Sequence, residues 1–284
     1  ASCGSSPRSS RKHSTAFRVD SLAKRVPPAR SGSGEGGYFR SPPPRVLAHR
    51  GLALDAPENT LLAFAKAVAA GVTYLETDVH ESADGVAIVS HDDTLARVAG
   101  RKVNVNQLTV ADLRRVDLGF GQSFSTLAEA IDAFPEARFN IDVKSAGVVQ
   151  PTIDAIKVTN SVKRVLVTSF SRSRRAATVK GLPGVATSAA SGEMAQILAA
   201  ARLGILPRAR TLLARFDALQ LPEKWNGVRV VTPPLVRLAH EAGVEVHVWT
   251  INDPLDMARL LDLGVDGIVT DRADLALEVL RSRH

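Results

Sequence analysis

Short apolar segments alternate with amphipathic segments along most of the chain, beginning at Arg45. The apolar run Val46-Leu47-Ala48 is followed by residues 59–70, where apolar side chains recur at helical spacing and end at Gly71. The same alternation predicts further strands at residues 74–79, 139–143, 165–170, 185–189, 218–221, 244–251 and 267–270. It predicts further helices at residues 127–133, 151–156, 171–180, 193–203, 234–242, 254–263 and 273–281. Eight strand–helix units predict an α/β fold, a closed (β/α)8 TIM barrel, over residues 45–284.

One strand-like run, Gly85 to Ser90, does not fit this alternation. It follows the second strand after a short turn that contains Asp84-Gly85, a pair typical of two-residue hairpin turns. With these two residues at the centre of the turn, Asp78 lies opposite His91. We therefore predict a short β-hairpin extension after the second barrel strand, which folds His91 back onto the acids of that strand.

Residues 1–44 have a different composition, rich in Ser, Arg, Gly and Pro, and end in Pro42-Pro43-Pro44. Without sustained apolar periodicity, they are expected to form a flexible N-terminal arm. The arm holds eight Lys or Arg residues and two acids, so most of the net charge of +7 belongs to it. A nucleic-acid enzyme would be expected to spread positive charge around its cleft. The near-neutral body favours a small-molecule substrate and no nucleic acid.

Cysteine content and hydropathy limit where the protein is expected to work. The one cysteine, Cys3, allows no internal disulfide, so the fold does not depend on an oxidising compartment. No apolar run reaches the length of about 18 residues that a membrane span needs. We expect a cytoplasmic protein; the small residues around Cys3 leave an exported or lipid-anchored form open, and the oligomeric state is open as well.

Polar residues gather at the carboxyl ends of the predicted strands, where barrel enzymes carry their active sites. His49-Arg50 follow the first strand, Glu76 and Asp78 share one face of the second, and Asp142 and Lys144 share one face of the third. Buried acids at such positions are costly unless they are paired or bind a metal. Three carboxylates suit Mg²⁺ or Ca²⁺, and no Cys or tight His cluster argues for zinc.

Two histidines, His49 and His91, each follow an apolar strand and meet these charged residues. Side chains that titrate near neutrality suit proton transfer during cleavage of a phosphate ester. Glu58, which follows Pro57 above the first strand, is expected to orient Arg50. Two aromatic residues near strand ends are candidates for substrate contacts at the mouth, Trp249 and Phe170.

Nine short motifs, taken together and in order, resemble the signature of the glycerophosphodiester phosphodiesterase family over residues 45–284. They are His49-Arg50-Gly51, Pro57-Glu58-Asn59-Thr60, Glu76-x-Asp78-Val79, Asp84-Gly85, His91-Asp92, Asn140-Ile141-Asp142-Val143-Lys144, Ser169-Phe170, Val248-Trp249-Thr250-Ile251-Asn252 and Gly264-Val265-Asp266-Gly267-Ile268-Val269-Thr270-Asp271.

The resemblance implies roles for the residues that match these motifs. His49 and His91 would form the acid/base pair of an in-line displacement at phosphorus, with the assignment of acid and base left open. A divalent cation would be held by Glu76, Asp78 and Asp142, and the phosphate would be faced by Arg50 and Lys144. The attacking group would be water or the neighbouring glycerol hydroxyl. The family more often has Glu at the position of Asp142, and the related sphingomyelinase D group has Asp there.

We therefore expect metal-dependent hydrolysis of glycerophosphodiesters, the deacylated phospholipids, to sn-glycerol 3-phosphate and an alcohol. One alternative is lysophospholipase D or sphingomyelinase D-like action on intact lipids. It needs an apolar surface around the mouth, and no exposed aromatic cluster is evident in the sequence. An alternative of another class is a barrel that binds phosphate esters without turnover, which the loss of a histidine or an acid would favour; none is lost.

Overall fold

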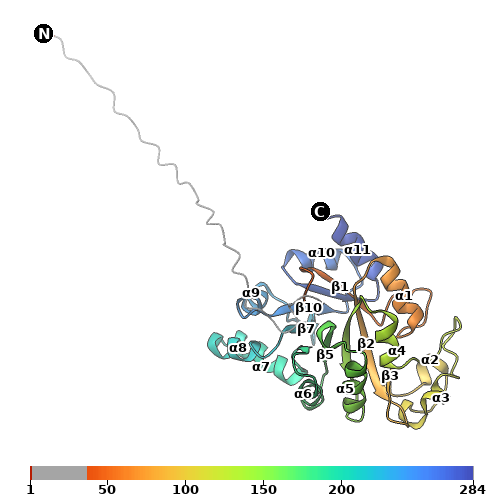
Figure 1. The fold of residues 1–284 in the computed structure, drawn as a ribbon. Helices are drawn as coiled ribbons and strands as arrows, with labels where there is room; N and C mark the ends of the chain where they lie inside the picture. The colour runs from red at the N-terminus through yellow and green to blue at the C-terminus, as the bar shows by residue number, and fades with distance from the viewer. Residues whose placement is uncertain (2–36, 284) are drawn as a thin grey trace.

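The predicted apolar strands form a parallel barrel in the computed structural model, which describes residue 1 and residues 37–283 (Figure 1). The strands lie in the order β6-β5-β4-β2-β1-β11-β10-β7, and a parallel bridge from Ser188 to Ala218 links β6 to β7. The predicted (β/α)8 TIM barrel is therefore confirmed. The barrel strands are β1 (Arg45–His49), β2 (Tyr74–Glu81), β4 (Arg138–Val143), β5 (Val165–Thr168), β6 (Ala186–Thr187), β7 (Ala218–Pro222), β10 (Glu245–Trp249) and β11 (Gly267–Thr270).

Helices surround the barrel because each buries one apolar face against the strands (Figure 1). Those that the sequence predicts are α1 (Leu61–Ala70), α4 (Leu127–Ala133), α5 (Val149–Val158), α6 (Arg172–Gly181), α7 (Ser191–Arg202), α9 (Pro233–Glu241), α10 (Pro254–Asp262) and α11 (Ala273–Arg281). The structure adds elements that the sequence did not predict: α2 (Ala96–Ala99), α3 (Val110–Leu113), α8 (Leu206–Leu213), the 3-10 turns η1 (Val105–Gln107) and η2 (Val162–Arg164), and a small hairpin of β8 (Lys224–Trp225) and β9 (Val228–Arg229).

The segment between β3 (Ala87–Val89) and α4 forms an annex with its own small core. Ile88 of β3 packs in this core with five buried side chains of the annex, Leu95, Val105, Leu113, Val116 and Phe124. His91 lies at the start of the annex, and its partner Asp92 is bonded to Arg97 of the same segment.

The predicted hairpin exists, but its turn is longer by one residue than expected. The antiparallel register pairs Val79 with Val89 and Glu81 with Ala87, so Ser90, not His91, lies opposite Asp78. The reason is a three-residue connection, in which Gly85 has the positive φ of +75° that closes such loops. The prediction that His91 pairs with Asp78 is therefore wrong by one position.

The amino-terminal opening of the barrel is closed by residues that the sequence assigned to the flexible arm. Tyr38 and Phe39 are buried, and Tyr38 makes edge-to-face ring contacts with Phe39 and Tyr74. The prediction of a loose arm is thus wrong for these two residues, because their aromatic rings find an apolar surface that only the closed barrel provides. Residues 2–36 of the predicted arm lie outside the described residues.

The barrel floor also contains a buried ion pair. Arg45 donates to both carboxylate oxygens of Glu245, at 2.8 and 2.9 Å, and His247 Nε2 lies 3.0 Å from the same carboxylate. These side chains are buried at alternate positions of β1 and β10, and a buried charge is costly without a partner, so their pairing is needed. Among the residues described, no helix is long and apolar enough to cross a membrane.

Candidate active site

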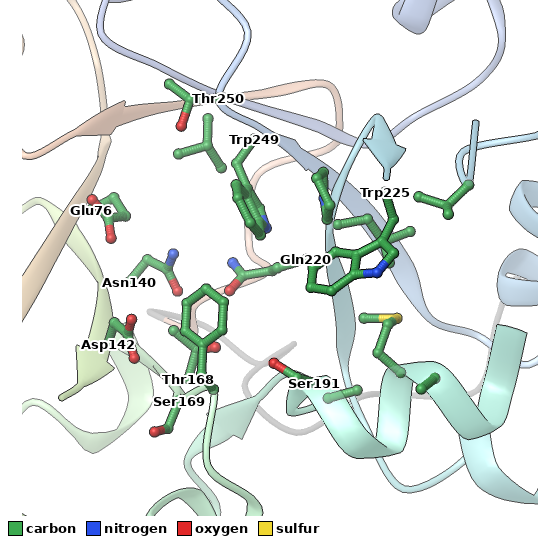
Figure 2. Close-up of a pocket in the computed structure, with 18 of the residues that line it drawn as sticks. Glu76, Asn140, Asp142, Thr168, Ser169, Ser191, Gln220, Trp225, Trp249 and Thr250 are labelled. Carbon is green, nitrogen blue, oxygen red and sulfur yellow. The ribbon is translucent and has the colours of Figure 1, made fainter. Parts of the chain in front are cut away.

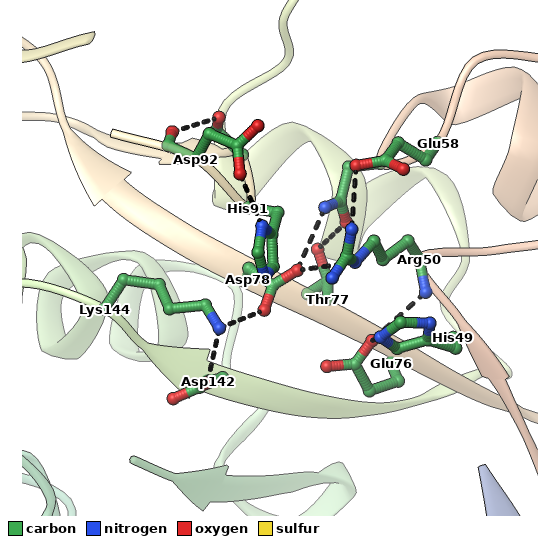
Figure 3. Close-up of polar contacts among 12 residues, drawn as sticks. His49, Arg50, Glu58, Glu76, Thr77, Asp78, His91, Asp92, Asp142 and Lys144 are labelled. Atoms are coloured by element: carbon green, nitrogen blue, oxygen red, sulfur yellow. Dashed lines mark hydrogen bonds and ion pairs between the residues drawn. The ribbon is translucent and has the colours of Figure 1, made fainter. Parts of the chain in front are cut away.

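The carboxyl ends of β1, β2 and β4 meet at one rim because these strands pair in parallel. Their register sets His49 beside Glu76, and Asp78 beside Asp142. Alternate residues share one face of a strand, so both acids of β2 enter the barrel mouth, where Lys144 also lies. Figure 3 shows this convergence. The three acids that the sequence singled out are all buried.

His49 is oriented by a carboxylate from the last strand. Its Nδ1 lies 2.6 Å from Asp271 Oδ1, and Asn252 donates to the other oxygen of Asp271 at 2.8 Å. An ionised carboxylate only accepts, so Nδ1 carries the proton and Nε2 of the neutral ring is left as the acceptor. Burial lowers the pKa of His49, but the bond to Asp271 and the charge of Glu76 outweigh burial, so this pKa is raised overall.

His91 has the same kind of partner. Its Nδ1 lies 2.7 Å from Asp92 Oδ1, while Arg97 Nε donates to the second oxygen of Asp92 at 2.6 Å. Both histidine rings line one cavity. The site therefore contains two imidazoles, each held by a carboxylate through Nδ1 and each with Nε2 available for proton transfer.

The acids at the centre have unequal electrostatic surroundings. Lys144 Nζ lies between two of them, 2.9 Å from Asp78 Oδ1 and 2.7 Å from Asp142 Oδ2. Burial alone would raise the pKa of Asp78, but Lys144 and Arg50 hold it below its usual value. Among the described residues no lysine or arginine side chain pairs with Glu76, and burial beside charged Asp78 raises its pKa to about 8. Burial also raises the pKa of Asp142.

Arg50 is held by several partners over the acids of β2. Its Nη1 donates to Glu58 Oε1 at 3.0 Å and its Nε lies 3.4 Å from Asp78 Oδ2, so the expected contact between Glu58 and Arg50 is present. Arg97 Nη2 donates to the same oxygen of Glu58 at 2.6 Å. Asn59 Nδ2 donates to Asp78 Oδ2 at 3.1 Å. A continuous set of charged contacts thus links the partner of His91 to Arg50 and Asp78.

The loop after β1 adopts backbone conformations that side chains rarely occupy. Arg50 and Asn59 have φ values of +58° and +56°, and Gly51 has φ of +88°. A Cβ atom on Gly51 would lie 2.7 Å from Ala63, so only glycine fits there. Such conformations are costly and persist where the surrounding contacts hold them, as they do around a binding site.

These groups occupy one end of a cavity of about 710 Å³. Trp249, at the end of β10, and Phe170, after β5, form its middle, with their rings 6.0 Å apart and edge to face. Lys144 Nζ lies 5.7 Å from the centre of the Phe170 ring. Trp225 of the β8–β9 hairpin lines the far end (Figure 2). The mouth therefore carries three aromatic side chains, of which Phe170 and Trp225 are exposed and Trp249 is partly buried. This differs from the expectation from the sequence, because the three residues come from distant segments.

All ten residues predicted for the site lie in or beside this cavity. Nine line it: His49, Arg50, Glu76, Asp78, His91, Asp142, Lys144, Phe170 and Trp249. Glu58 contacts Arg50 from outside. The residues predicted from the sequence did not include Asp271, although its position at the end of the last strand would have indicated a place at the mouth. It also missed Arg97, Trp225 and the face of α7, for which no local sequence signal exists.

The three buried acids offer carboxylate oxygens to a divalent cation. Asp142 Oδ1 is buried and has no hydrogen-bond partner among the described residues. Burial beside charged Asp78 raises the pKa of Glu76, so the ionised form of Glu76 is unfavourable unless a cation binds it. Hard carboxylate oxygens of this kind fit Mg²⁺ or Ca²⁺. Yet among residues 37–283 no group of three or more histidines, cysteines or acids is arranged as a finished metal site. The donor set fits a cation, which would have to share Asp78 and Asp142 with Lys144.

Comparison with known proteins identifies the family to which this geometry belongs. Residues 49–275 match the model of the Glycerophosphoryl diester phosphodiesterase family. The chain belongs to this family. The resemblance seen in its motifs is thereby confirmed, together with the expectation of an enzyme of the phosphodiesterase class.

Relatives and solved structures agree with this assignment. The chain is 43% identical to "Probable glycerophosphodiester phosphodiesterase 2" of Mycobacterium tuberculosis, over 84% of this chain and 91% of that protein. It is 31% identical to a glycerophosphodiester phosphodiesterase of Caldanaerobacter subterraneus, over 83% and 97%. A crystal structure from Silicibacter pomeroyi matches 90% of this chain and 98% of its own, at 26% identity and a TM-score of 0.73.

Proposed function

We propose that the protein hydrolyses glycerophosphodiesters to sn-glycerol 3-phosphate and an alcohol, with His49 and His91 as the acid/base pair. The observation that carries the proposal is the matched pair of imidazoles in one cavity, each bound to a carboxylate through Nδ1. Proton transfer to and from a phosphodiester needs two groups that titrate near neutrality, one for the attacking oxygen and one for the leaving alcohol.

Charged residues around the histidines would bind and polarise the phosphate. Arg50 and Lys144 supply fixed positive charge at the mouth, where low dielectric strengthens their attraction for phosphodiester oxygens. Glu76, Asp78 and Asp142 would hold a divalent cation, and such a cation would add Lewis-acid stabilisation of charge on those oxygens. Glu58 keeps Arg50 in place, while Trp249 and Phe170 would bound the substrate beyond the phosphate.

The proposal is tested by turnover of glycerophosphocholine, with enzymatic detection of sn-glycerol 3-phosphate. His49→Ala and His91→Ala should each lower kcat by at least about 10²-fold, because each removes a group that transfers a proton. His240→Ala serves as the control, since His240 pairs with Asp266 outside the cavity. Near-wild-type rates in either of the two test variants would contradict the acid/base pair.

The cation requirement is tested in the same assay with EDTA and with added Mg²⁺ or Ca²⁺. Loss of activity in EDTA and its return with either ion would support the carboxylate site. Full activity in EDTA would refute it. Tight binding of the substrate with no turnover under all conditions would instead favour a barrel that only binds phosphate esters.

A further inference from the structure

Positive charge outside the N-terminal arm is concentrated in one segment, residues 171–229. This segment holds ten Lys or Arg residues and three acids, a net charge of +7. The rest of residues 45–284 holds 18 basic and 24 acidic residues, a net charge of −6. The segment forms α6, α7, α8 and the β8–β9 hairpin, and Figure 1 shows the three helices together on one side of the barrel. One side of the molecule is therefore strongly positive and the remainder is negative.

Two loops of this segment combine exposed apolar side chains with basic ones. The first loop, residues 202–208, joins α7 to α8, and all seven of its residues are exposed. Its large apolar side chains are Leu203, Ile205 and Leu206, and Leu203 is 74% exposed. An arginine stands at each end of the loop, and the loop contains no acid.

The second loop, residues 224–229, is the β8–β9 hairpin, and it is also exposed throughout. Trp225 and Val228, which are 58% and 54% exposed, lie between a lysine and an arginine at its ends. Arg202 of the first loop lines the same cavity as Trp225, so the two loops are neighbours. Figure 2 shows Trp225 across the cavity from Ser191, the first residue of α7.

Most of the basic side chains in the two loops are free to bind a partner. Arg202, Arg208 and Lys224 form no ion pair with any of residues 37–283, whereas Arg229 lies 3.2 Å from Glu223. Large apolar side chains that stay exposed are unfavourable in water and mark a binding surface. Protein–protein interfaces are depleted in lysine and pair polar groups of both kinds. Apolar tips that carry cations alone suit a surface of phosphates over an apolar layer.

We propose that the two loops dock on an anionic lipid bilayer. The apolar side chains insert among the head groups, where Trp and aliphatic residues are favoured, and the flanking cations contact the lipid phosphates. The bilayer is bound as a surface and is not the substrate, so the proposal is independent of the proposed function. Docking would hold the rim of the cavity that contains Trp225 against the bilayer.

The test mixes the full chain with vesicles of phosphatidylcholine, either pure or with about 30% phosphatidylglycerol, and measures the bound fraction by sedimentation. Binding should require phosphatidylglycerol and should weaken as salt is added, because the ions screen the cations from the phosphates. Insertion is measured with lipids brominated on the acyl chain, which should quench the fluorescence of Trp225. The Trp249→Phe variant is used for this measurement, since the chain has two tryptophans.

Substitutions at the loops should weaken binding without affecting the reaction. Leu203→Ser and Arg208→Gln should each lower the vesicle partition coefficient by about fivefold or more, because they remove an inserted side chain and a phosphate contact. The matched control is Leu255→Ser, which should bind as the wild type does. Leu255 is 81% exposed, but it lies between Asp253 and Asp256.

Leu203 and Arg208 lie outside the cavity, so both loop variants should turn over glycerophosphocholine at the wild-type rate, which also shows that they fold. Trp225→Ser should reduce vesicle binding in the same way and tests the second loop separately.

The results that would overturn the proposal are specific. No binding of the wild type to vesicles with phosphatidylglycerol would overturn it. Equal binding by the wild type and all the loop variants would also overturn it and would assign binding to residues 1–44, which hold eight basic residues and two acids. Binding without quenching of Trp225 would refute insertion. Unchanged vesicle binding with a lower molecular mass of the variants in solution would assign the loops to a second copy of the chain. Absence of glycerophosphocholine turnover in the wild type would overturn only the proposed function.

Discussion

At the scale of single residues, the site depends on carboxylates that orient imidazoles. Asp271 and Asp92 stand in equivalent positions on His49 and His91, although they come from different elements. A carboxylate on Nδ1 fixes the tautomer and the ring orientation, and it stabilises the imidazolium form. Each histidine therefore acts as a unit with its acid, and the acid can be tested separately.

Asp271→Asn should move the limb of the pH–rate profile that belongs to His49 to lower pH. The hydrogen bond from Asp271 favours protonated His49 and contributes to its raised pKa, so its loss lowers that pKa. A profile of kcat/KM against pH would show the shift, together with a reduced maximum. Asp274→Asn is the matched control, since Asp274 of α11 pairs with Arg272, the residue that precedes this helix. An unchanged limb in Asp271→Asn would mean that this contact does not set the proton affinity of His49.

Glu76→Gln should stabilise the protein in EDTA, and more strongly at pH 9 than at pH 5. The pKa of Glu76 is raised to about 8 by burial beside Asp78, so the folded state favours the protonated acid. The resulting loss of stability begins as pH rises past the ordinary pKa of 4.5 and is complete above about 8, reaching a few kcal/mol.

Thermal unfolding of Glu76→Gln and of the exposed control Glu278→Gln would measure this effect. Added Mg²⁺ or Ca²⁺ should raise the Tm of the wild type at pH 9 and have less effect on Glu76→Gln, because the cation removes the same charge penalty. An equal pH response in wild type and Glu76→Gln would contradict the assignment of a raised pKa to Glu76.

At the scale of elements, strand register brings the acids and His49 together, while the annex supplies the rest. Parallel pairing of β1, β2 and β4 aligns their ends without any help from side chains at the site. Helix α2 then places Arg97 against both Asp92 and Glu58. We infer that Arg97 is a positioning residue, because it contacts the partners of His91 and Arg50 and does not line the main cavity.

Arg97→Gln should lower kcat/KM for glycerophosphocholine by about 10-fold or more, the usual effect of losing such a supporting contact. Part of the loss should appear in KM, because Glu58 loses one of its two cationic partners and orients Arg50 less well. Arg101→Gln, an exposed position in the same annex, should behave as wild type. If both variants retain full activity and KM, the ion-pair chain has no function in catalysis.

At the scale of the whole molecule, the two ends of the barrel differ in how accessible they are to solvent. The mouth keeps polar groups accessible for chemistry, whereas the floor is sealed by Tyr38 and Phe39 over the Arg45–Glu245 pair. Sealing excludes water from this pair and packs the lower layer of side chains. The segment that closes the floor therefore contributes to stability, and it lies at the end of the barrel opposite the mouth.

Tyr38→Ala should lower the free energy of unfolding by about 3–5 kcal/mol, the typical cost of removing a fully buried aromatic ring. The Tyr38 hydroxyl has no hydrogen-bond partner among the described residues, so Tyr38→Phe should keep or increase stability. Chemical denaturation of both variants would measure these changes, with Arg40→Ala as an exposed control. A small change in the free energy of unfolding of Tyr38→Ala would show that this buried ring does not stabilise the barrel floor.

The order of strands and helices, and most residues of the candidate site, could be predicted from the sequence. Apolar periodicity is a local property, and an i, i+2 pair of acids on a strand faces one side in any fold. For the same reason, Glu76 with Asp78 and Asp142 with Lys144 could be selected before the barrel was seen. The length of the turn at Gly85 was the local feature that the pattern did not decide, because two- and three-residue loops share the same Asp-Gly signal.

Contacts between distant segments were decided only by the tertiary structure. Asp271 reaches His49 across 222 positions of sequence, Tyr38 finds its surface only in the closed barrel, and the two exposed loops are neighbours only because α7 lies beside the β8–β9 hairpin. No local pattern encodes these arrangements, since each depends on the packing of all eight strands. The sequence by itself determined which charged and titratable groups lie at the barrel mouth, and the tertiary structure decided how these groups are oriented and what lies beyond them.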